Sequence, residues 1–464
     1  MELGGAQVAD AEIEARVQWS NAATLGESNP FDLDEWSARK QVAAIRSGKR
    51  ITGHTARLRE EPLWSYLAGG VSDDHNAATT EEVLERVRLG AAITVMAGSM
   101  NDNTAAVFAD VPALGDGVYH ICFCADDKHV EDLHDQGHID HHVREAIRAG
   151  VEPMLTWRMA TLTAALYYRL DHLVGSITPS RLADIQLVPD LGDARPSLVL
   201  VGGTVVAENG KPLFANNDAT PATTRNTIRL HPELSPESFA VKAPGPKAWV
   251  QAMEMYDGYF KRAFHAELDV VDGGVRCDIE RDVLKVAIVD RHHASKTIGV
   301  GFVRGFQLRK GALAATTNCE NQNLVMVGVT DRDLADAARA IEQIGGGYVA
   351  VADGKVLASV PLPIAGIMSD QPWETVREQS IDANKAAASL GCAIHSPFMI
   401  MAFIGLAGVP DLGLTEKGLI DTASQSFADL VLGRRAGMVC CRCPDHIHDV
   451  HRLMDPSSFR AEPV

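Results

Sequence analysis

The sequence has no long apolar run and no apolar leader at its N-terminus. Its longest apolar stretch, FMIMAFIGLAGV at 398–409, is too short to cross a bilayer as a helix and suits a buried core segment. The first 19 residues mix acidic and apolar side chains and have neither the basic start nor the apolar core of a signal peptide. We therefore expect a cytoplasmic protein with no membrane partner.

Basic residues are also scarce, since 43 Lys and Arg stand against 61 Asp and Glu, a formal net charge of −18. Phosphate binding needs a basic footprint, so this balance argues against a nucleic-acid partner. The eight cysteines are scattered along the chain and do not form a compact disulfide framework, as expected of a cytoplasmic protein. With 464 residues, 46% of them hydrophobic, the chain can form about three domains of roughly 150 residues each.

Residues 21–150 alternate between apolar runs and helical patterns. The apolar runs predict strands that end in polar residues, at 21–28, 50–55, 69–75, 91–99 and 119–127. The patterns between and after them predict helices at 33–48, 61–68, 79–90, 103–111 and 130–150. Such alternation is typical of parallel strands joined by helical crossovers. Because four of the five strands end in Glu, His or Asp, and barrel active sites form at the C-terminal ends of strands, a (β/α) barrel is favoured.

The chain changes character after residue 150. A long helix is predicted at 152–170, and short β segments separated by turn residues follow it. From these patterns we predict five parts, all within an α/β fold class. They are a (β/α) barrel region at 1–172, a small β domain segment at 173–231, a linker at 232–245, a C-terminal α/β domain at 246–433 and a Cys- and His-containing tail at 434–464.

Metal-binding side chains stand at successive strand ends of the predicted barrel. His54, His75 and an aspartate of the Asp126–Asp127 pair follow three of the strands, and Glu27 ends a fourth. Imidazole and carboxylate groups suit the common hydrolytic metals, which make water a strong nucleophile near neutral pH. Glu27 could bridge two such ions, and Asp126 is placed to take a proton from water and pass it to a leaving amine.

A single histidine after an apolar run is more often a structural residue than a metal ligand. The predicted metal site therefore depends on the four strand ends taken together. The histidines at 134, 138, 141 and 142 fall near one side of a predicted helix, for which a solvated face is the favoured interpretation. His129, close after the aspartates, could instead orient a substrate or a metal-binding carboxylate.

The segment CADDKHVEDLHDQGHIDHHVREAIRAGVEPMLTWRMAT at 124–161 resembles the bacterial adenine deaminases of the amidohydrolase superfamily. The likeness extends to GHTARL, to GGVSDDHNAATTEEVLERVRLG and to a long C-terminal block that includes VAIVDRHHASKTIGVGFVRGFQLRKGALAAT and IEQIGGGYVAVADGK. It covers most of residues 1–425. The resemblance implies a metal-dependent hydrolase with a (β/α)8-type barrel, a small β domain and a C-terminal α/β domain.

The reaction that the resemblance implies is adenine plus water giving hypoxanthine plus ammonia, at a two-metal site usually holding manganese or iron, with zinc as a further option. It makes Glu27 the bridging carboxylate, His54 and His75 metal ligands, and Asp126 the catalytic base, a role for which Asp127 is the alternative. A small-molecule purine is then the substrate, and we expect a homo-oligomer.

The chain departs from the family pattern in three places. It has no His-x-His pair upstream of Glu27, where the family has one in its first barrel strand, so it resembles a family member that begins partway through the barrel. We therefore expect an open, partial barrel with an incomplete two-metal site and little deaminase activity. Two loops also differ, at 96–99 and 319–323. Ser99 and Glu320 of these loops, together with His129, are candidate substrate-binding residues.

Two other functions remain open on the sequence alone. The chain could be a degenerate, non-catalytic homologue, or an amidohydrolase that acts on another aminopurine-like substrate. The tail offers a further metal-binding candidate, because three cysteines and three histidines fall within 440–451. Their spacing is too tight for a usual zinc finger, so a structural zinc there is the less favoured interpretation.

Overall fold

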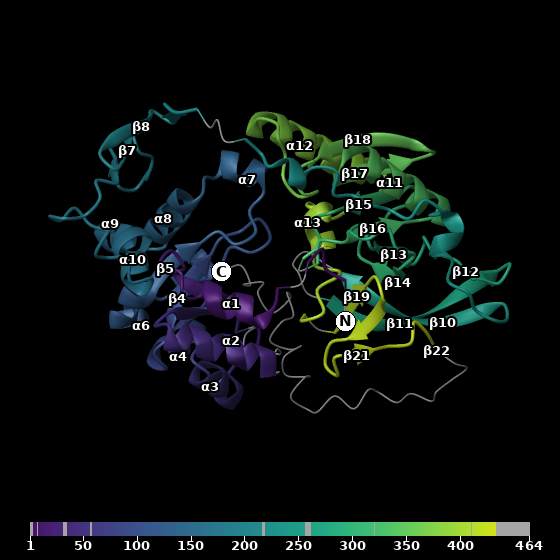
Figure 1. Cartoon of the computed structure of the whole chain (residues 1–464), viewed down its shortest axis with the longest axis horizontal. Helices are drawn as coiled ribbons and strands as arrows, with labels where there is room; N and C mark the ends of the chain where they lie inside the picture. Colours follow the sequence, from purple (N-terminus) through teal and green to yellow (C-terminus); the bar gives the residue numbers. More distant parts are fainter. Residues whose placement is uncertain are drawn as a thin grey trace, which may run out of the picture.

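The computed structural model describes residues 3–6, 8–30, 35–55, 58–215, 219–255, 261–319, 321–409 and 411–432. They form two α/β lobes side by side, with a small antiparallel sheet at the outer edge of the first lobe (Figure 1). Among these residues no helix is both long and apolar enough to cross a bilayer. The Cys440–His451 cluster lies outside the described residues.

Five parallel strands form the sheet of the first lobe. They are β1 (Thr24–Ser28), β2 (Arg50–Gly53), β3 (Asp73–Asp74), β4 (Ala92–Met96) and β5 (Ile121–Cys124). β1 pairs with β2, and β3, β4 and β5 pair in that order. Ser72 joins the two groups, because its N–H donates to Ile51 O and its carbonyl accepts from Ala92 N, both at 3.0 Å. The strands thus follow one another in chain order, as the alternating pattern predicted.

Helices connect these strands. After the short α1 (Asp10–Arg16) come α2 (Glu35–Arg46), α3 (Glu60–Ala68), α4 (Thr80–Arg88), α5 (Thr104–Val107), α6 (Val111–Leu114) and the 3-10 turn η1 (Gly115–His120). α4 begins where the sequence predicted, since the Thr79 side chain accepts a hydrogen bond from Glu82 N. Its Val83 packs against Ile93 of β4 and Ile121 of β5 in the core of this lobe.

The predicted helix at 130–150 is two helices, α7 (Val130–Asp135) and α8 (Ile139–Arg148). The break falls at Gly137, whose φ of 103° is left-handed and favours glycine. The solvated face expected for the histidines is wrong for His142. Its ring is fully buried, with Nε2 2.6 Å from Cys124 O and Nδ1 3.1 Å from His138 O.

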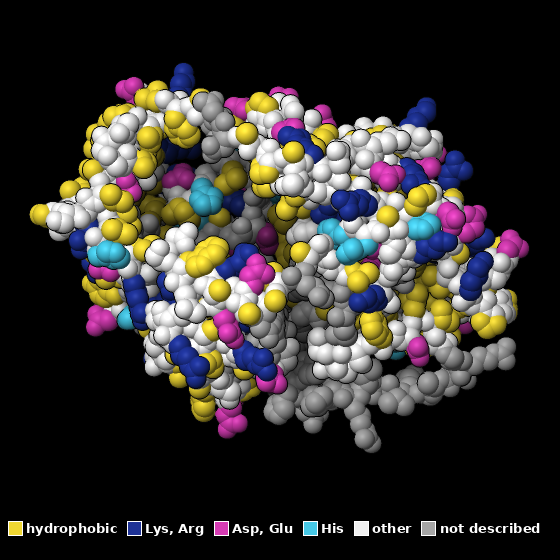
Figure 2. Space-filling view, viewed as in Figure 1, with side chains coloured by type: hydrophobic (Ala, Val, Ile, Leu, Met, Phe, Trp, Pro, Cys, Tyr) yellow, Lys and Arg dark blue, Asp and Glu magenta, His cyan; other side chains and the backbone are white. Residues whose placement is uncertain are grey.

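The predicted helix at 152–170 is also segmented, into α9 (Pro153–Arg158), the π-helical turn η2 (Met159–Thr163) and α10 (Ala164–Tyr167). A four-stranded antiparallel sheet follows, made of β6 (Ile185–Leu187), β7 (Leu198–Val201), β8 (Thr204–Glu208) and β9 (Lys211–Pro212). Apolar side chains gather along this sheet at the upper left of the space-filling view (Figure 2).

Residues 232–245 were expected to be a linker because of their Pro- and Ser-rich composition. After the short turn η3 (Ala222–Thr224), however, this segment forms the 3-10 turn η4 (Pro236–Phe239) and packs into the second lobe. Leu234 and Phe239 are buried in the same apolar cluster as helix α11 (Asp331–Ile344). The segment is therefore a packed part of the second lobe.

A ten-stranded sheet forms the second lobe. Its order is β12-β11-β10-β14-β13-β16-β15-β17-β18, with β22 against β10, and all pairs but β10–β14 are antiparallel. Its strands are β10 (Lys247–Met255), β11 (Lys261–Val271), β12 (Gly274–Val275), β13 (Leu284–Val289), β14 (Ile298–Arg304), β15 (Ala312–Ala315), β16 (Leu324–Gly328), β17 (Gly347–Ala352), β18 (Lys355–Pro361) and β22 (Val431–Leu432).

Both faces of this sheet are covered. β13 is buried along its whole length, and its side chains alternate between two apolar clusters. Leu284, Val286 and Ile288 face the cluster with α12 (Trp373–Ser389) and α13 (Pro397–Ala402), whereas Ala287 and Val289 face α11. A smaller sheet of β19 (Leu412–Thr415), β20 (Gly418–Asp421) and β21 (Ser426–Phe427) completes the lobe.

Candidate active site

Three predicted metal ligands meet at the C-terminal edge of β1, β2 and β3. One ligand atom from each of Glu27, His54 and His75 can be chosen so that all three lie within 4.8 Å of one another. His54 Nδ1 is 3.2 Å from Glu27 Oε1 and 3.1 Å from His75 Nε2, and His75 Nε2 is 3.8 Å from Glu27 Oε2. Two imidazoles and a carboxylate at this spacing fit a divalent cation. Among the described residues, these three form the one group of His, Cys, Asp or Glu side chains that lie close enough together to hold a metal ion.

The strand ends approach closely because of a glycine. Gly53, the last residue of β2, has no room for a Cβ, which would lie 2.3 Å from Asp73 O and 2.5 Å from Val71 Cγ1. β2 and β3 can therefore run close together at the point where His54 and His75 leave them. The GHT motif thus needs its glycine for the approach and its histidine for the site.

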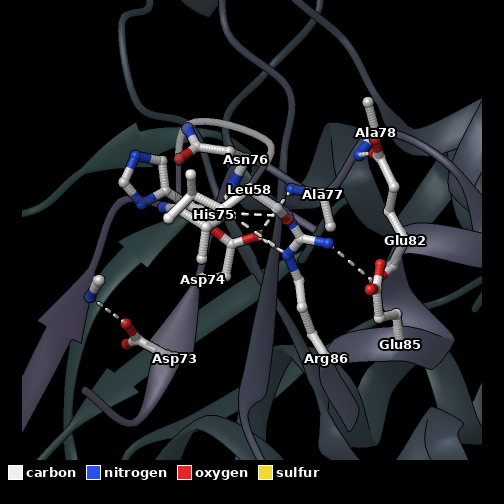
Figure 3. Close-up of polar contacts among 12 residues, drawn as sticks. Leu58, Asp73, Asp74, His75, Asn76, Ala77, Ala78, Glu82, Glu85 and Arg86 are labelled. Atoms are coloured by element: carbon white, nitrogen blue, oxygen red, sulfur yellow. Dashed lines mark hydrogen bonds and ion pairs between the residues drawn. The ribbon is translucent and has the colours of Figure 1, made fainter. Parts of the chain in front are cut away.

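A buried ion pair holds the two loops that follow His54 and His75. Arg86 of α4 places Nε 2.7 Å from Asp74 Oδ2, and both side chains are fully buried. Asp74 also accepts hydrogen bonds from the backbone N–H groups of Thr55, Asn76 and Ala77, at 3.1, 3.1 and 2.9 Å. Figure 3 shows Arg86 extending from α4 to this carboxylate, next to His75. One carboxylate therefore organises the backbone that follows both ligands.

The surroundings favour the neutral form of His54. Burial and the neighbouring His75 lower the pKa of His54 to about 4, against a partial opposing effect of Asp74. A neutral imidazole is the form that binds metal. The pKa of Glu27 is raised, first by desolvation and then by the carboxylates of Asp126, Asp73 and Asp74, while His75 opposes the rise. A divalent cation would offset this concentration of negative charge.

A cleft opens beside the three residues, and both lobes line it. His54, Asn76, Met96, Gly98, Met100, Asn101, Asp126 and Asp127 line it from the first lobe, and Phe403, Leu406 and Val409 from the second. Most of the lining is apolar, with amide and carboxyl groups at a few points. This composition is typical of small-molecule sites.

The two aspartates after β5 line this cleft but stand outside the group of three. Asp126 is exposed and has a left-handed backbone, with a φ of 55°. Asp127 is half-buried, and burial together with the adjacent Asp126 and with Glu27 raises its pKa to about 6, while His75 opposes the rise. The assignment of Asp126 as a metal ligand stays a prediction, as does the choice between the two as base.

The candidate substrate-binding residues are placed differently. The Ser99 hydroxyl accepts from His129 N at 2.7 Å, and Ser99 N donates to Asp127 O at 2.6 Å, so Ser99 joins the loop after β4 to the loop after β5. Neither Ser99 nor His129 is among the described residues that line the cleft. His129 Nε2 is buried without a hydrogen-bond partner in the structure. Glu320 lies outside the described residues.

Sequence reasoning missed Arg86 and the three residues of the second lobe. Arg86 sits inside a charged helix, where an arginine most often faces solvent, and no local pattern shows that it is buried. Phe403, Leu406 and Val409 fall within the apolar run at 398–409, which predicted only a core segment. These three residues reach the cleft because the two lobes pack against each other. Such packing depends on contacts between residues that are distant in the sequence.

Comparison with known proteins agrees with this geometry. Residues 21–206 match the model of the amidohydrolase family, and residues 259–426 match the adenine deaminase C-terminal domain. An adenine deaminase of Desulforamulus reducens is 38% identical over 426 residues, which are 90% of this chain and 72% of that protein. This chain belongs to the adenine deaminase family. An adenine deaminase of Moorella thermoacetica is 37% identical over 441 residues, 93% of this chain and 74% of that protein.

Family membership confirms the resemblance seen in the sequence and agrees with an α/β fold of the amidohydrolase type. Among solved structures, a zinc-bound adenosine deaminase from Xanthomonas campestris overlaps 45% of this chain and 59% of its own, at 16% identity and a TM-score of 0.35. The two structures thus superpose over less than half of this chain. The divalent metal centre is therefore inferred from the family and from the three converging side chains.

Proposed function

We propose that this chain hydrolyses adenine to hypoxanthine and ammonia at the cleft between its two lobes. The observation that carries the proposal is the convergence of Glu27, His54 and His75 beside that cleft in a chain of the adenine deaminase family. These three side chains would hold a divalent cation, for which we propose Mn2+, with Fe2+ and Zn2+ as alternatives. Such a cation supplies the Lewis acidity that makes water nucleophilic near neutral pH.

Two aspartates of the cleft are placed to transfer protons during the reaction. Water forms a bond to the ring carbon that carries the amine, and the bond from that carbon to the amine nitrogen breaks. Asp126 takes a proton from the attacking water and passes it to the leaving amine, so that ammonia departs and the ring keeps the oxygen. Asp127, whose pKa is raised to about 6, can hold this proton near neutral pH and is the alternative for the same step.

The walls of the cleft suit a planar, uncharged ring. Met96 and Met100 from one lobe and Phe403 from the other offer apolar contact, and Asn76 and Asn101 offer amide groups. An amide can pair with adjacent donor and acceptor atoms on the edge of an adenine ring. Among the described residues that line the cleft there is no Lys or Arg to pair with a phosphate. We therefore propose the free base as substrate in preference to a nucleotide.

An assay of both products tests the proposal. The chain loaded with Mn2+ should convert adenine to hypoxanthine and ammonia in a ratio of one to one, and it should leave AMP unchanged. His54→Ala and His75→Ala should abolish conversion, whereas His120→Ala, which alters an exposed histidine, should not. The three converging side chains can hold one ion, whereas the family site holds two. The low deaminase activity expected from an incomplete site stays a prediction, which the same assay measures.

The other outcomes decide between the alternatives. A chain that binds metal but converts no aminopurine would be a non-catalytic homologue. Conversion of another aminopurine in preference to adenine would keep the chemistry and change the substrate. A chain that binds no divalent metal at all would contradict the proposed centre.

A further inference from the structure

Three consecutive backbone N–H groups at the end of β2 are held by side chains. Gly53 N donates to Asp73 Oδ1 at 2.6 Å, His54 N donates to Tyr66 Oη at 2.9 Å, and Thr55 N donates to Asp74 Oδ1 at 3.1 Å. Side-chain acceptors from β3 and α3 thus fix the segment that carries His54. Its conformation depends on these three groups.

Tyr66 does more than the two aspartates, because its hydroxyl also donates to Ser28 O. Ser28 directly follows Glu27 on β1. A hydroxyl has one proton to donate and lone pairs to accept with, so these two hydrogen bonds have fixed directions. One oxygen atom therefore joins the backbone of the residue next to Glu27 to the backbone of His54.

The environment of Tyr66 suits this connection. The residue lies in α3, the crossover between β2 and β3, and only 9% of it is exposed. The bonded oxygen also lies close to Gly53, since a Cβ at that glycine would be 3.3 Å from it.

We infer that Tyr66 is a positioning residue of the metal centre, which sets the distance between Glu27 and His54 by joining the ends of β1 and β2. The inference rests on the proposed metal centre and goes beyond it, because Tyr66 is not one of the three side chains that form the centre. Groups that orient metal ligands in this way typically contribute about 10- to 100-fold to metal affinity.

The test compares Tyr66→Phe with Tyr119→Phe in the full chain. Phenylalanine keeps the ring and removes only the hydroxyl, and Tyr119, 52% exposed, is the matched control. Co2+ is titrated as a spectroscopic probe, and its visible absorption reports both affinity and coordination geometry. We expect Tyr66→Phe to bind Co2+ about 10- to 100-fold more weakly, with a shifted absorption band, and Tyr119→Phe to stay within twofold of the parent chain.

Hydrogen exchange of the peptide containing residues 50–55 provides a second measurement that needs no metal. We expect faster exchange in Tyr66→Phe than in the parent, because His54 N loses its acceptor. Unchanged Co2+ affinity and an unchanged band in Tyr66→Phe would overturn the inference, even if its thermal stability falls, since a merely structural role predicts that result. If the parent chain binds no Co2+, the proposed centre fails, and unchanged exchange would then overturn the positioning role as well.

Discussion

Arg86 Nε lies 2.7 Å from Asp74 Oδ2, and neither side chain has exposed surface. The guanidinium also donates to the Thr55 hydroxyl at 2.8 Å and to Leu58 O at 3.1 Å. Because Asp74 in turn holds the backbone after both histidine ligands, this pair connects helix α4 to the proposed metal centre. Removing one partner would leave the other charged and buried, which is the costly case for an ion pair.

Arg86→Ala should therefore lower the free energy of unfolding by about 3 to 5 kcal/mol. Arg88→Ala, two residues along the same helix and exposed, should change it by less than about 0.5 kcal/mol. Urea unfolding of the metal-free chain measures both. Equal effects of the two substitutions would show that the buried pair contributes nothing particular.

Asp127 should make the stability of the metal-free chain depend on pH. Its folded pKa of about 6 is above the unfolded value of about 3.9, so the folded chain binds more protons between these pH values. The free energy of unfolding should then fall as the pH rises from about 4 to about 6. Asp127→Asn should remove this decline and be more stable than the parent at pH 7 but not at pH 4.

Asp102→Asn is the control, because the pKa of Asp102 is shifted in the opposite direction to that of Asp127. Burial alone would raise the pKa of Asp102, but hydrogen bonds from Thr104 and His141 hold it below its usual range. The stability that Asp102 contributes is present above the unfolded pKa and is lost as the pH falls through the folded pKa. Asp102→Asn should thus be less stable than the parent at pH 7. If Asp127→Asn behaved in the same way, the raised pKa of Asp127 would be contradicted.

Phe403 should affect substrate binding more than turnover. It lines the cleft from the second lobe and is not one of the three predicted metal ligands, and its ring offers apolar contact to a planar substrate. We expect Phe403→Ala to raise KM for adenine about tenfold, since losing such contact costs roughly 1 to 3 kcal/mol, with kcat within about threefold and Co2+ affinity unchanged. Phe427→Ala, at a ring 53% exposed, should alter neither. A fall in kcat at constant KM would show that the Phe403 ring does not contribute to substrate binding.

The small β sheet and the helix before it should support self-association. Met154, Ile177, Leu187, Leu213 and Phe214 are each at least half exposed, with Ile177 at 85%. An apolar surface of this kind is typical of a protein–protein contact. Light scattering should give at least twice the mass of one chain, and Ile177→Asp with Phe214→Asp should lower this mass, whereas Leu89→Asp, directly after α4, should not. A parent chain that is monomeric at micromolar concentration would contradict the expected homo-oligomer.

The sequence predicted the five strands of the first lobe because each is a short apolar run that stops at a polar residue. The same feature placed Glu27, His54 and His75 at one edge of a parallel sheet, and the structure brings them together. The helix at 79–90 was predictable from local signals, namely the Thr79 cap and the acidic first turn. These are properties of neighbouring residues and do not depend on the rest of the fold.

Other features depend on contacts that are distant in sequence. The buried His142 contacts Cys124 O, which belongs to strand β5 and is 18 residues away in the sequence. The segment at 232–245 has a linker-like composition, yet Phe239 is buried against the second lobe. Tyr66 accepts from His54 N, and Arg86 donates to the Thr55 hydroxyl and to Leu58 O, so both act on groups more than ten residues away in the sequence. Phe403 lines the cleft from the second lobe, so its place there requires the two lobes to dock. No local pattern carries this information.

The central claim is that Glu27, His54 and His75 hold one divalent ion at the mouth of the cleft. Anomalous diffraction from crystals grown with Mn2+ or Zn2+ tests it most directly. The account predicts an anomalous peak within about 2.0 to 2.3 Å of one ligand atom from each of the three side chains, and its loss in His54→Ala crystals. A peak located elsewhere in the chain, or none beside these three residues at saturating metal, would contradict it.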